Sequence, residues 1–248
     1  MTTVYHRPVT VWEKVAETKW GRYISQIEED AILKAHRTAG KPVQALEIGC
    51  EGGRWSELLT DLGWNMVCTD IDEAALAACQ KRVPSAKCIR VLANDRTLPC
   101  TSSSMALILC LEVNPVIEAD WFLNEARRTL SDGGMVIGTF NNLCSLRGLF
   151  VRVKRRFRPK PWFSYYQMSY GHWRRNALDH GFTMLYERGF CWFPFSRASQ
   201  SPLIPTATMM ERKLRLQHLV ALSPWVVFIA QKKSGPVSNG EPVDTSSS

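Results

Sequence analysis

One stretch decides the fold of this chain, and it reads Ala45-Leu46-Glu47-Ile48-Gly49-Cys50-Glu51-Gly52-Gly53-Arg54-Trp55-Ser56-Glu57-Leu58-Leu59. Apolar residues lead into an acid, a glycine cluster follows at once, and Trp55, Leu58 and Leu59 then recur at helical spacing. This order predicts a strand, a tight turn and a helix. Such a turn leaves backbone N–H groups unpaired at the helix start and lets a ligand approach the glycine backbone closely, which suits a nucleotide-like cofactor.

The glycine spacing argues against a dinucleotide cofactor. Dinucleotide sites carry glycines at the first, third and sixth positions of the turn. Counting from Gly49, those later positions hold Glu51 and Arg54, and a carboxylate at Glu51 would repel a pyrophosphate. S-adenosylmethionine has no phosphate, and its sulfonium and ammonium outweigh its carboxylate. An acid in the turn is therefore tolerable, and Glu47 at the strand end can meet the ammonium.

The same stretch resembles the first motif of the class I S-adenosylmethionine-dependent methyltransferases, which runs acid-x-Gly-x-Gly-x-Gly. Glu47, Gly49 and Gly53 match that motif, in the manner of small-molecule methyltransferases of type 11. Glu51 stands where the pattern has its middle glycine. The backbone path of the turn is therefore the feature in which this chain could differ from the family. The resemblance implies S-adenosyl-L-methionine as the cofactor.

Two further acids follow strands in the expected order. Residues 65–70 predict a second strand that ends at Asp70, where a carboxylate can accept both ribose hydroxyls. Asp72 precedes an alanine-rich helical run and is expected to cap that helix. Residues 88–92 predict a third strand. After it, the resemblance implies that Asp95 accepts from the adenine amino group and that the backbone N–H of Arg96 meets the ring.

The middle of the chain continues the pattern. Residues 106–111 are apolar throughout, as a strand covered on both faces should be, and residues 135–140 predict a fifth strand. The run 125–134 resembles the family's acid-x-x-arginine-x-leucine-x-proline-glycine-glycine segment, with Asp132 in place of the proline. The complete set of predicted cofactor-binding residues is Glu47, Gly49, Cys50, Gly53, Asp70, Ile71, Asp95, Arg96 and Leu111.

The remaining elements complete the expected domain. Residues 182–195 and 225–231 predict the sixth and seventh strands, with an insertion of roughly thirty residues between them. The resemblance implies an α/β, Rossmann-like, doubly wound, seven-stranded and mostly parallel sheet with an antiparallel last strand. We expect a single methyltransferase domain over residues 1–233, with an N-terminal helical cap (1–42), a cofactor-binding core (43–142) and an acceptor-pocket and lid region (143–233). The tail 234–248 is expected to be disordered.

A basic segment without acids occupies residues 143–178. Large apolar and aromatic side chains interleave with its cations, most densely over 145–166. This composition predicts either a lid over a lipophilic acceptor or an element that lies on an anionic membrane. A solvated helix face beside an aromatic cluster is the alternative. The basic residues are Arg147, Arg152, Lys154, Arg155, Arg156, Arg158, Lys160, Arg174 and Arg175.

Composition and charge limit what can be expected about metal sites, disulfides and location. The chain of 248 residues has a formal charge of +8 and eight cysteines. No Cys-x-x-Cys pair occurs, so free thiols are expected, with neither a metal site nor a disulfide framework. The N-terminus carries His6, Arg7, Glu13 and Lys14 where a secretory signal would be apolar, and no apolar run is long enough to span a bilayer. We expect a cytoplasmic protein with peripheral contact to the inner membrane face.

The chemistry leaves alternatives open. Methyl transfer from a sulfonium mainly requires alignment of nucleophile, methyl and sulfur, and a general base only where an acceptor proton leaves early. Glu112, His172 and His180 are the candidate bases, each with a structural role as the alternative. The basic pI of 9.2 also permits a nucleic-acid-binding methyltransferase. Glu51 and the missing base signal permit a catalytically silent, cofactor-binding partner subunit. The acceptor and the oligomeric state are not determined by the sequence.

Overall fold

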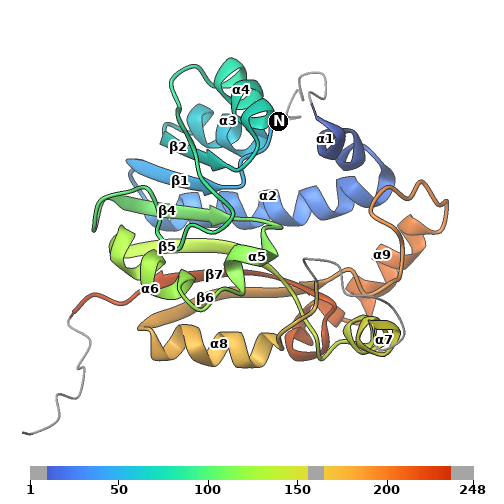
Figure 1. Ribbon diagram of the computed structural model, residues 1–248. Coiled ribbons are helices and arrows are strands. Elements are labelled where there is room, and N and C mark those ends of the chain that lie inside the picture. The colour runs from blue at the N-terminus through green and yellow to red at the C-terminus, as the bar shows by residue number, and fades with distance from the viewer. Residues whose placement is uncertain (1–9, 156–164, 236–248) are drawn as a thin grey trace, which may run out of the picture.

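The computed structural model describes residues 10–155 and 165–235. Its centre is a seven-stranded sheet in the order β3-β2-β1-β4-β5-β7-β6 (Figure 1). The first five strands pair in parallel, whereas β7 is antiparallel to both β5 and β6, which confirms the predicted doubly wound sheet. The strands are β1 (Gln44–Ile48), β2 (Asn65–Asp70), β3 (Lys87–Arg90), β4 (Met105–Cys110), β5 (Leu130–Asn141), β6 (Phe182–Phe190) and β7 (Trp225–Lys232).

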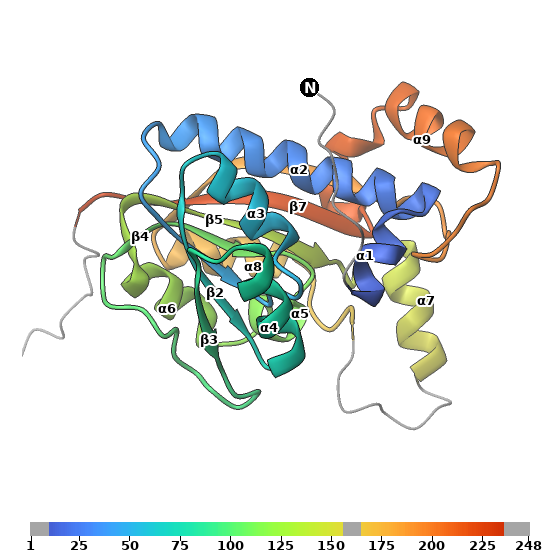
Figure 2. The same cartoon turned by 90° about the horizontal axis from the view of Figure 1, so that it is seen from above.

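Helices cover both faces of this sheet (Figures 1 and 2). One core cluster joins the sheet to α2 (Lys19–Ala39), α3 (Arg54–Asp61), α4 (Glu73–Arg82) and α9 (Ile204–Lys213). A second cluster joins the opposite face to α5 (Asn114–Ile117), α6 (Phe122–Thr129) and α8 (Tyr170–Asp179). Because both faces are buried, the central strands are apolar along their length, as the sequence indicated for β4.

The remaining helices are α1 (Val11–Ala16) and α7 (Leu146–Arg155), and two short 3-10 turns follow α9 at Leu216–His218 and Val220–Leu222. The expected N-terminal helix is therefore divided in two. The division falls at Thr18, whose hydroxyl accepts from the N–H of Gly21 and so caps α2. Asp72 caps α4 by accepting from the N–H of Ala74, as the sequence predicted.

Two strands end earlier than expected, for local reasons. β6 ends at Phe190 because Cys191 adopts a left-handed conformation (φ 61°) that turns the chain away from the sheet. β3 ends at Arg90, and the N–H of Leu92 then bonds to the Asp95 carboxylate instead of to a strand partner. Residues 236–248 of the expected tail and residues 156–164 of the segment 145–166 lie outside the described residues.

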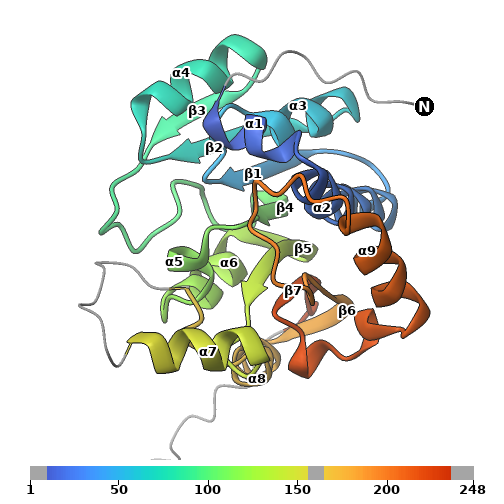
Figure 3. The same ribbon diagram turned by 90° about the vertical axis from the view of Figure 1, so that its right-hand side faces the viewer.

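The carboxyl ends of the parallel strands share one edge of the sheet, which is where ligands bind in open α/β sheets. Figure 3 looks onto this edge. The short helix α1 lies in front of it, and the segment 191–203, which connects β6 to α9, runs across it. Within the two described ranges, no helix combines the length and apolar character needed to cross a bilayer.

Candidate cofactor and acceptor site

The glycine turn between β1 and α3 has a strongly curved backbone. Gly49 (φ 69°), Glu51 (φ 48°) and Gly53 (φ 77°) all adopt the left-handed conformation. The N–H groups of Gly49 and Cys50 both donate to the carbonyl of Thr69 on β2, at 2.8 and 3.0 Å. A Cβ atom at position 49 would lie 2.6 Å from Cγ2 of Val113. Glycine is therefore required at 49 by both conformation and close packing, and the turn lies directly against the end of β4.

Glu51 lies at the centre of this turn. It takes a left-handed conformation that glycine adopts without strain, at a cost of about 1–2 kcal/mol for a residue with a side chain. Its carboxylate accepts hydrogen bonds from the Thr10 side chain and from the backbone of Trp12, although burial raises its pKa. Thr10 also lies against Gly52, within 2.9 Å of the position of an added Cβ. Glu51 thus fastens the turn to α1.

Asp70 lies beside the turn at the end of β2. One carboxylate oxygen accepts from the N–H of Glu51 at 2.9 Å, and the other accepts from the N–H of Asp72 at 3.0 Å. The residue is half-buried, whereas Ile71 beside it is 53% exposed. Each carboxylate oxygen can accept more than one hydrogen bond, so both remain able to accept from a ligand. This is the arrangement that a ribose-binding acid needs.

Asp95 and Arg96 lie on the exposed loop between β3 and β4. The run that resembles the family's acid-x-x-arginine segment holds this loop in place. Glu125 accepts from the N–H of Leu98 at 2.8 Å, and Arg128 donates to the carbonyls of Leu98 and Cys100 at 3.1 and 2.9 Å. Arg128 also pairs with Glu125, which lowers the pKa of that carboxyl. The segment therefore positions the predicted adenine contacts without touching them.

Glu47 is placed differently from the other predicted acids. It is buried, and its carboxyl accepts a hydrogen bond from Ser56 on α3. Burial, reinforced by the nearby Cys68, raises its pKa to about 8. The carboxyl is therefore tied to α3 beneath the turn. Cys50 is also buried, and Leu111 is half-buried against the core. Both residues therefore support the site from behind more than they line its surface.

A partly buried network of charges, which the sequence did not reveal, covers the end of β4. Arg197, from the segment that crosses the sheet edge, forms an ion pair with Glu112. Its guanidinium lies 5.1 Å from the ring of Trp12 on α1 and 5.6 Å from the ring of Trp225 on β7. Arg197 thereby joins α1, β4 and β7, which are far apart in the sequence.

The network continues from Arg197 through Glu28 to Arg54. Glu28 is 1% exposed on α2 and interacts electrostatically with both arginines. Arg54 at the start of α3 lies 3.8 Å from Glu28 and donates to Ser25 at 2.7 Å. One carboxylate oxygen of Glu28 and one of Glu112 are buried without a hydrogen-bond partner among the described residues. Such oxygens are costly unless a ligand donates to them.

Of the three candidate bases, only Glu112 lies beside the turn, since it precedes Val113, which packs on Gly49. It has a positive φ of 60°, and its N–H donates to the hydroxyl of Thr139 at 2.5 Å. His172 is exposed at the start of α8. His180 follows α8 just before β6, at the opposite edge of the sheet, where its carbonyl accepts from Arg127. Because β6 runs in the same direction as the parallel strands, its amino end, where His180 lies, is at the edge away from this site.

Comparisons with known proteins agree with this geometry. Residues 46–138 match the family described as a methyltransferase domain. This region is therefore a methyltransferase domain, and the structural matches include S-adenosylmethionine-dependent methyltransferases. No curated protein matches the chain.

Solved structures share the fold of this methyltransferase at low sequence identity. A putative S-adenosylmethionine-dependent methyltransferase from Listeria monocytogenes is 11% identical, with a TM-score of 0.60 over 85% of this chain and 99% of that one. Geranyl diphosphate methyltransferase, in complex with GPP and sinefungin, is 11% identical, with a TM-score of 0.58 over 86% and 80%. The [4+2]-cyclase SpnF is 15% identical, with a TM-score of 0.58 over 89% and 84%.

The residues present fit S-adenosyl-L-methionine, the cofactor of this family. Glycine at 49 and 53 permits the left-handed turn, and Asp70 beside the turn keeps acceptor capacity on both carboxylate oxygens. Near Arg54 at the start of α3, the buried carboxylate oxygen of Glu28 that has no hydrogen-bond partner among the described residues suits a ligand that carries an ammonium and a sulfonium. The cofactor supplies an activated methyl group when bound.

Proposed function

We propose that this methyltransferase transfers the methyl group to a small lipophilic acceptor by in-line displacement at the carboxyl edge of the sheet. One observation carries the proposal: the glycine turn, Asp70 and the Glu112–Arg197 pair meet at that edge under α1 and the segment 191–203. A covered edge of this kind holds two reactants in line and excludes water, and such alignment can supply most of the rate.

The predicted cofactor residues take separate parts in this proposal. Gly49 and Gly53 permit the curved turn that holds the methionine end, with Glu47 and Cys50 bracing the turn from inside. Asp70 binds the ribose hydroxyls, and Ile71 next to it offers an exposed apolar surface to the adenine. Asp95 and the N–H of Arg96 bind the adenine edge, and Leu111 packs behind the methionine end. These assignments are supported by the common location of the residues.

We assign Glu112 as the carboxylate that faces the acceptor. Arg197 binds one of its oxygens, and the other is buried without a described partner. This second oxygen can accept a proton or a hydrogen bond from an acceptor hydroxyl or amine. Arg197 holds the carboxylate in position and keeps the segment 191–203 closed over it.

Replacing Glu112 by Gln is expected to lower methyl transfer by about 100-fold if its carboxylate accepts a proton, the lower end of what general bases contribute. The affinity for S-adenosylhomocysteine should change little, since the substitution keeps the shape of the side chain. Turnover with labelled cofactor and isothermal titration with S-adenosylhomocysteine measure the two effects separately. His180→Gln, at the opposite edge, is the control and should leave both values unchanged. Equal losses of affinity and turnover in Glu112→Gln would show that Glu112 holds the cofactor instead.

An open cavity of about 300 Å³ lies at α5, the helix that begins two residues after Glu112. Pro115, Ala119 and Met168 give it an apolar wall, and Asn114, Glu118 and Gln167 add polar groups. A cavity of this size and lining can hold a small molecule with one polar end. It supports entry of a lipophilic acceptor from the side of α5.

The helix α7 supplies the second argument for a lipophilic acceptor. Leu146, Leu149, Phe150 and Val153 form a stripe at helical spacing, and all four are exposed, Leu146 by 84% and Phe150 by 68%. Arg152 and Lys154 lie exposed on the same helix. An apolar stripe flanked by cations matches the surface of an anionic bilayer. We propose that α7 docks there and that the acceptor is taken from the bilayer.

Sedimentation with vesicles tests this docking. Each cation near an anionic surface contributes about 1 kcal/mol, so replacing both Arg152 and Lys154 by Gln should weaken vesicle binding by about 30-fold. The matched control replaces Lys81 and Lys87, which are exposed on α4 and β3, and should bind as the wild type does. Equal binding to neutral and anionic vesicles, or equal losses in both double variants, would leave α7 as a solvated helix.

The proposed function as a whole is tested by incubating the full chain with methyl-labelled cofactor and three acceptor pools: a lipid extract, an aqueous metabolite extract and mixed tRNA. We expect one labelled product in the lipid extract that depends on both protein and cofactor. Label in tRNA would instead support the nucleic-acid-binding alternative, and label only in the aqueous pool would contradict a lipophilic acceptor. Binding of S-adenosylhomocysteine without label in any pool would favour the catalytically silent partner subunit.

A further inference from the structure

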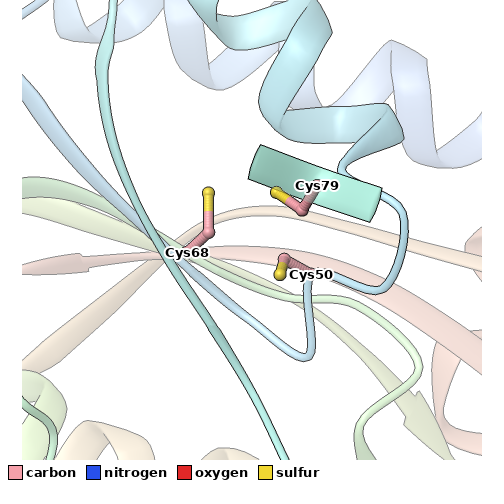
Figure 4. Close-up of side chains that lie close together, drawn as sticks. All are labelled: Cys50, Cys68 and Cys79. Carbon is pink, nitrogen blue, oxygen red and sulfur yellow. The ribbon is translucent and has the colours of Figure 1, made fainter. Parts of the chain in front are cut away.

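Three buried cysteines meet beneath the cofactor turn. Cys50 belongs to the turn, Cys68 lies on β2 and Cys79 lies on α4 (Figure 4). Their sulfur atoms all lie within 4.8 Å of one another. The residues are 3%, 0% and 0% exposed, respectively. All eight cysteines, which fall within the described ranges, are free thiols, so these three are available as ligands.

The sequence predicted no metal site because its cysteines lack the short spacings of familiar metal motifs. The fold creates the cluster instead. β2 pairs with β1, and the turn that carries Cys50 follows β1. The helix α4 packs on the face of the sheet whose core cluster contains Cys68. Residues that are distant in the sequence therefore place their sulfur atoms in one space.

Thiolate sulfur is the ligand that soft and borderline d10 cations such as Cu(I) and Zn(II) prefer. Metal–sulfur bonds of about 2.3 Å place three sulfur ligands about 4 Å apart, so the present cluster needs only small side-chain shifts to close around an ion. A hydroxyl group is also in place to support a thiolate, since Ser56 Oγ lies 3.0 Å from Cys68 Sγ.

A fourth thiol offers a route from the surface. Cys88 on β3 lies beside Cys68 in the strand register, and it is only half-buried. An ion that first binds at Cys88 can pass to the inner sulfur atoms by exchange of one thiolate ligand for another. Cys88 can also remain as a fourth ligand for a cation that prefers tetrahedral coordination.

We propose that Cys50, Cys68 and Cys79 form a binding site for one thiophilic d10 cation, Cu(I) or Zn(II). On binding, each participating S–H bond breaks, its proton passes to solvent and a sulfur–metal bond forms, with no change of oxidation state. The ion cross-links the cofactor turn to β2 and α4. Cys79 touches the turn a second time, because its sulfur lies 2.7 Å from where a Cβ of Gly53 would be. Occupancy therefore stabilises the turn and the folded chain together.

Titration of the reduced, metal-free full chain under anaerobic conditions tests the site. Cd(II), monitored by its sulfur-to-metal charge-transfer absorption, is the probe for Zn(II)-like binding. Cu(I), supplied in competition with a colorimetric chelator, is the second probe. We expect saturation at one equivalent for at least one of the two ions, together with a higher thermal midpoint. The ion that saturates the site shows whether the site prefers Cu(I) or a Zn(II)-like cation.

Four variants make the test specific. Cys79→Ala should abolish this binding, and Cys50→Ala serves the same purpose should Cys79→Ala fail to fold. Cys110→Ala, which removes a thiol from the other core cluster, and Cys144→Ala, which removes an exposed one, should bind as the wild type does. The proposal is overturned if neither ion saturates the chain at one equivalent, or if binding persists in folded Cys79→Ala and Cys50→Ala.

Discussion

Replacement of Arg82 by leucine is expected to lower the free energy of unfolding by about 3–5 kcal/mol, because it leaves a buried carboxylate without its arginine. Arg82 on α4 and Glu13 on α1 are only 7% and 6% exposed at their side chains. The guanidinium contacts both carboxylate oxygens of Glu13, the second at 3.1 Å, and lies 3.6 Å from Glu57. Urea denaturation of the two proteins measures the difference.

The pair also holds α1 against the cofactor turn, since Glu13 and Thr10 both lie against Gly52. We therefore expect Arg82→Leu to weaken binding of S-adenosylhomocysteine as well. The matched control is Arg90→Leu, which breaks the exposed pair between Arg90 and Glu73, with side chains 54% and 73% exposed. Exposed pairs contribute about 0–1 kcal/mol. Similar destabilisation by the two substitutions would contradict a buried clamp between α1 and α4.

Replacement of Asp70 by alanine is expected to weaken S-adenosylhomocysteine binding by about 10- to 150-fold. Hydrogen bonds to a charged group contribute about 1.5–3 kcal/mol, and the proposed ribose contact is made by a carboxylate. The substitution also removes the acceptor for the N–H groups of Glu51 and Asp72, so the turn loses a support at the same time. Isothermal titration gives the affinity.

Two variants separate ligand binding from this support. Asp70→Asn keeps an acceptor oxygen and the side-chain volume, and its loss of affinity should fall between those of the wild type and Asp70→Ala. Asp72→Ala removes only the cap of α4, which should cost about 1 kcal/mol of stability and leave the affinity nearly unchanged. Unaltered binding of S-adenosylhomocysteine by Asp70→Ala would remove Asp70 from the cofactor site.

The residues that carry the family resemblance have different structural roles. Gly49 and Asp70 lie at the turn itself. Glu125 and Arg128 act one step away, because they fix the loop that carries Asp95. Glu51, the one departure inside the first motif, keeps the left-handed backbone and gains a contact with α1. Some residues of the motif therefore set the backbone path, and others are placed to contact a ligand.

The sequence by itself determined the features that arise from neighbouring residues. The change from strand to helical spacing around Gly49 located β1, the turn and α3, and the acid before an alanine-rich run located the cap at Asp72. Asp70 could be assigned to the carboxyl edge, because parallel strands in a doubly wound sheet all end there. Each of these inferences depends on backbone geometry that extends over only a few residues.

Only the tertiary structure decided which distant side chains meet. Arg197 reaches Glu112 because the connection after β6 crosses the sheet edge, whereas His180 precedes β6 and so lies at the opposite, amino-terminal edge. The division of the N-terminal segment at Thr18 sets α1 over the turn, where Glu13 meets Arg82. The cluster of Cys50, Cys68 and Cys79 arises in the same way. These contacts are fixed by strand order and helix packing, which bring together residues whose spacing in the sequence carries no periodic or turn signal.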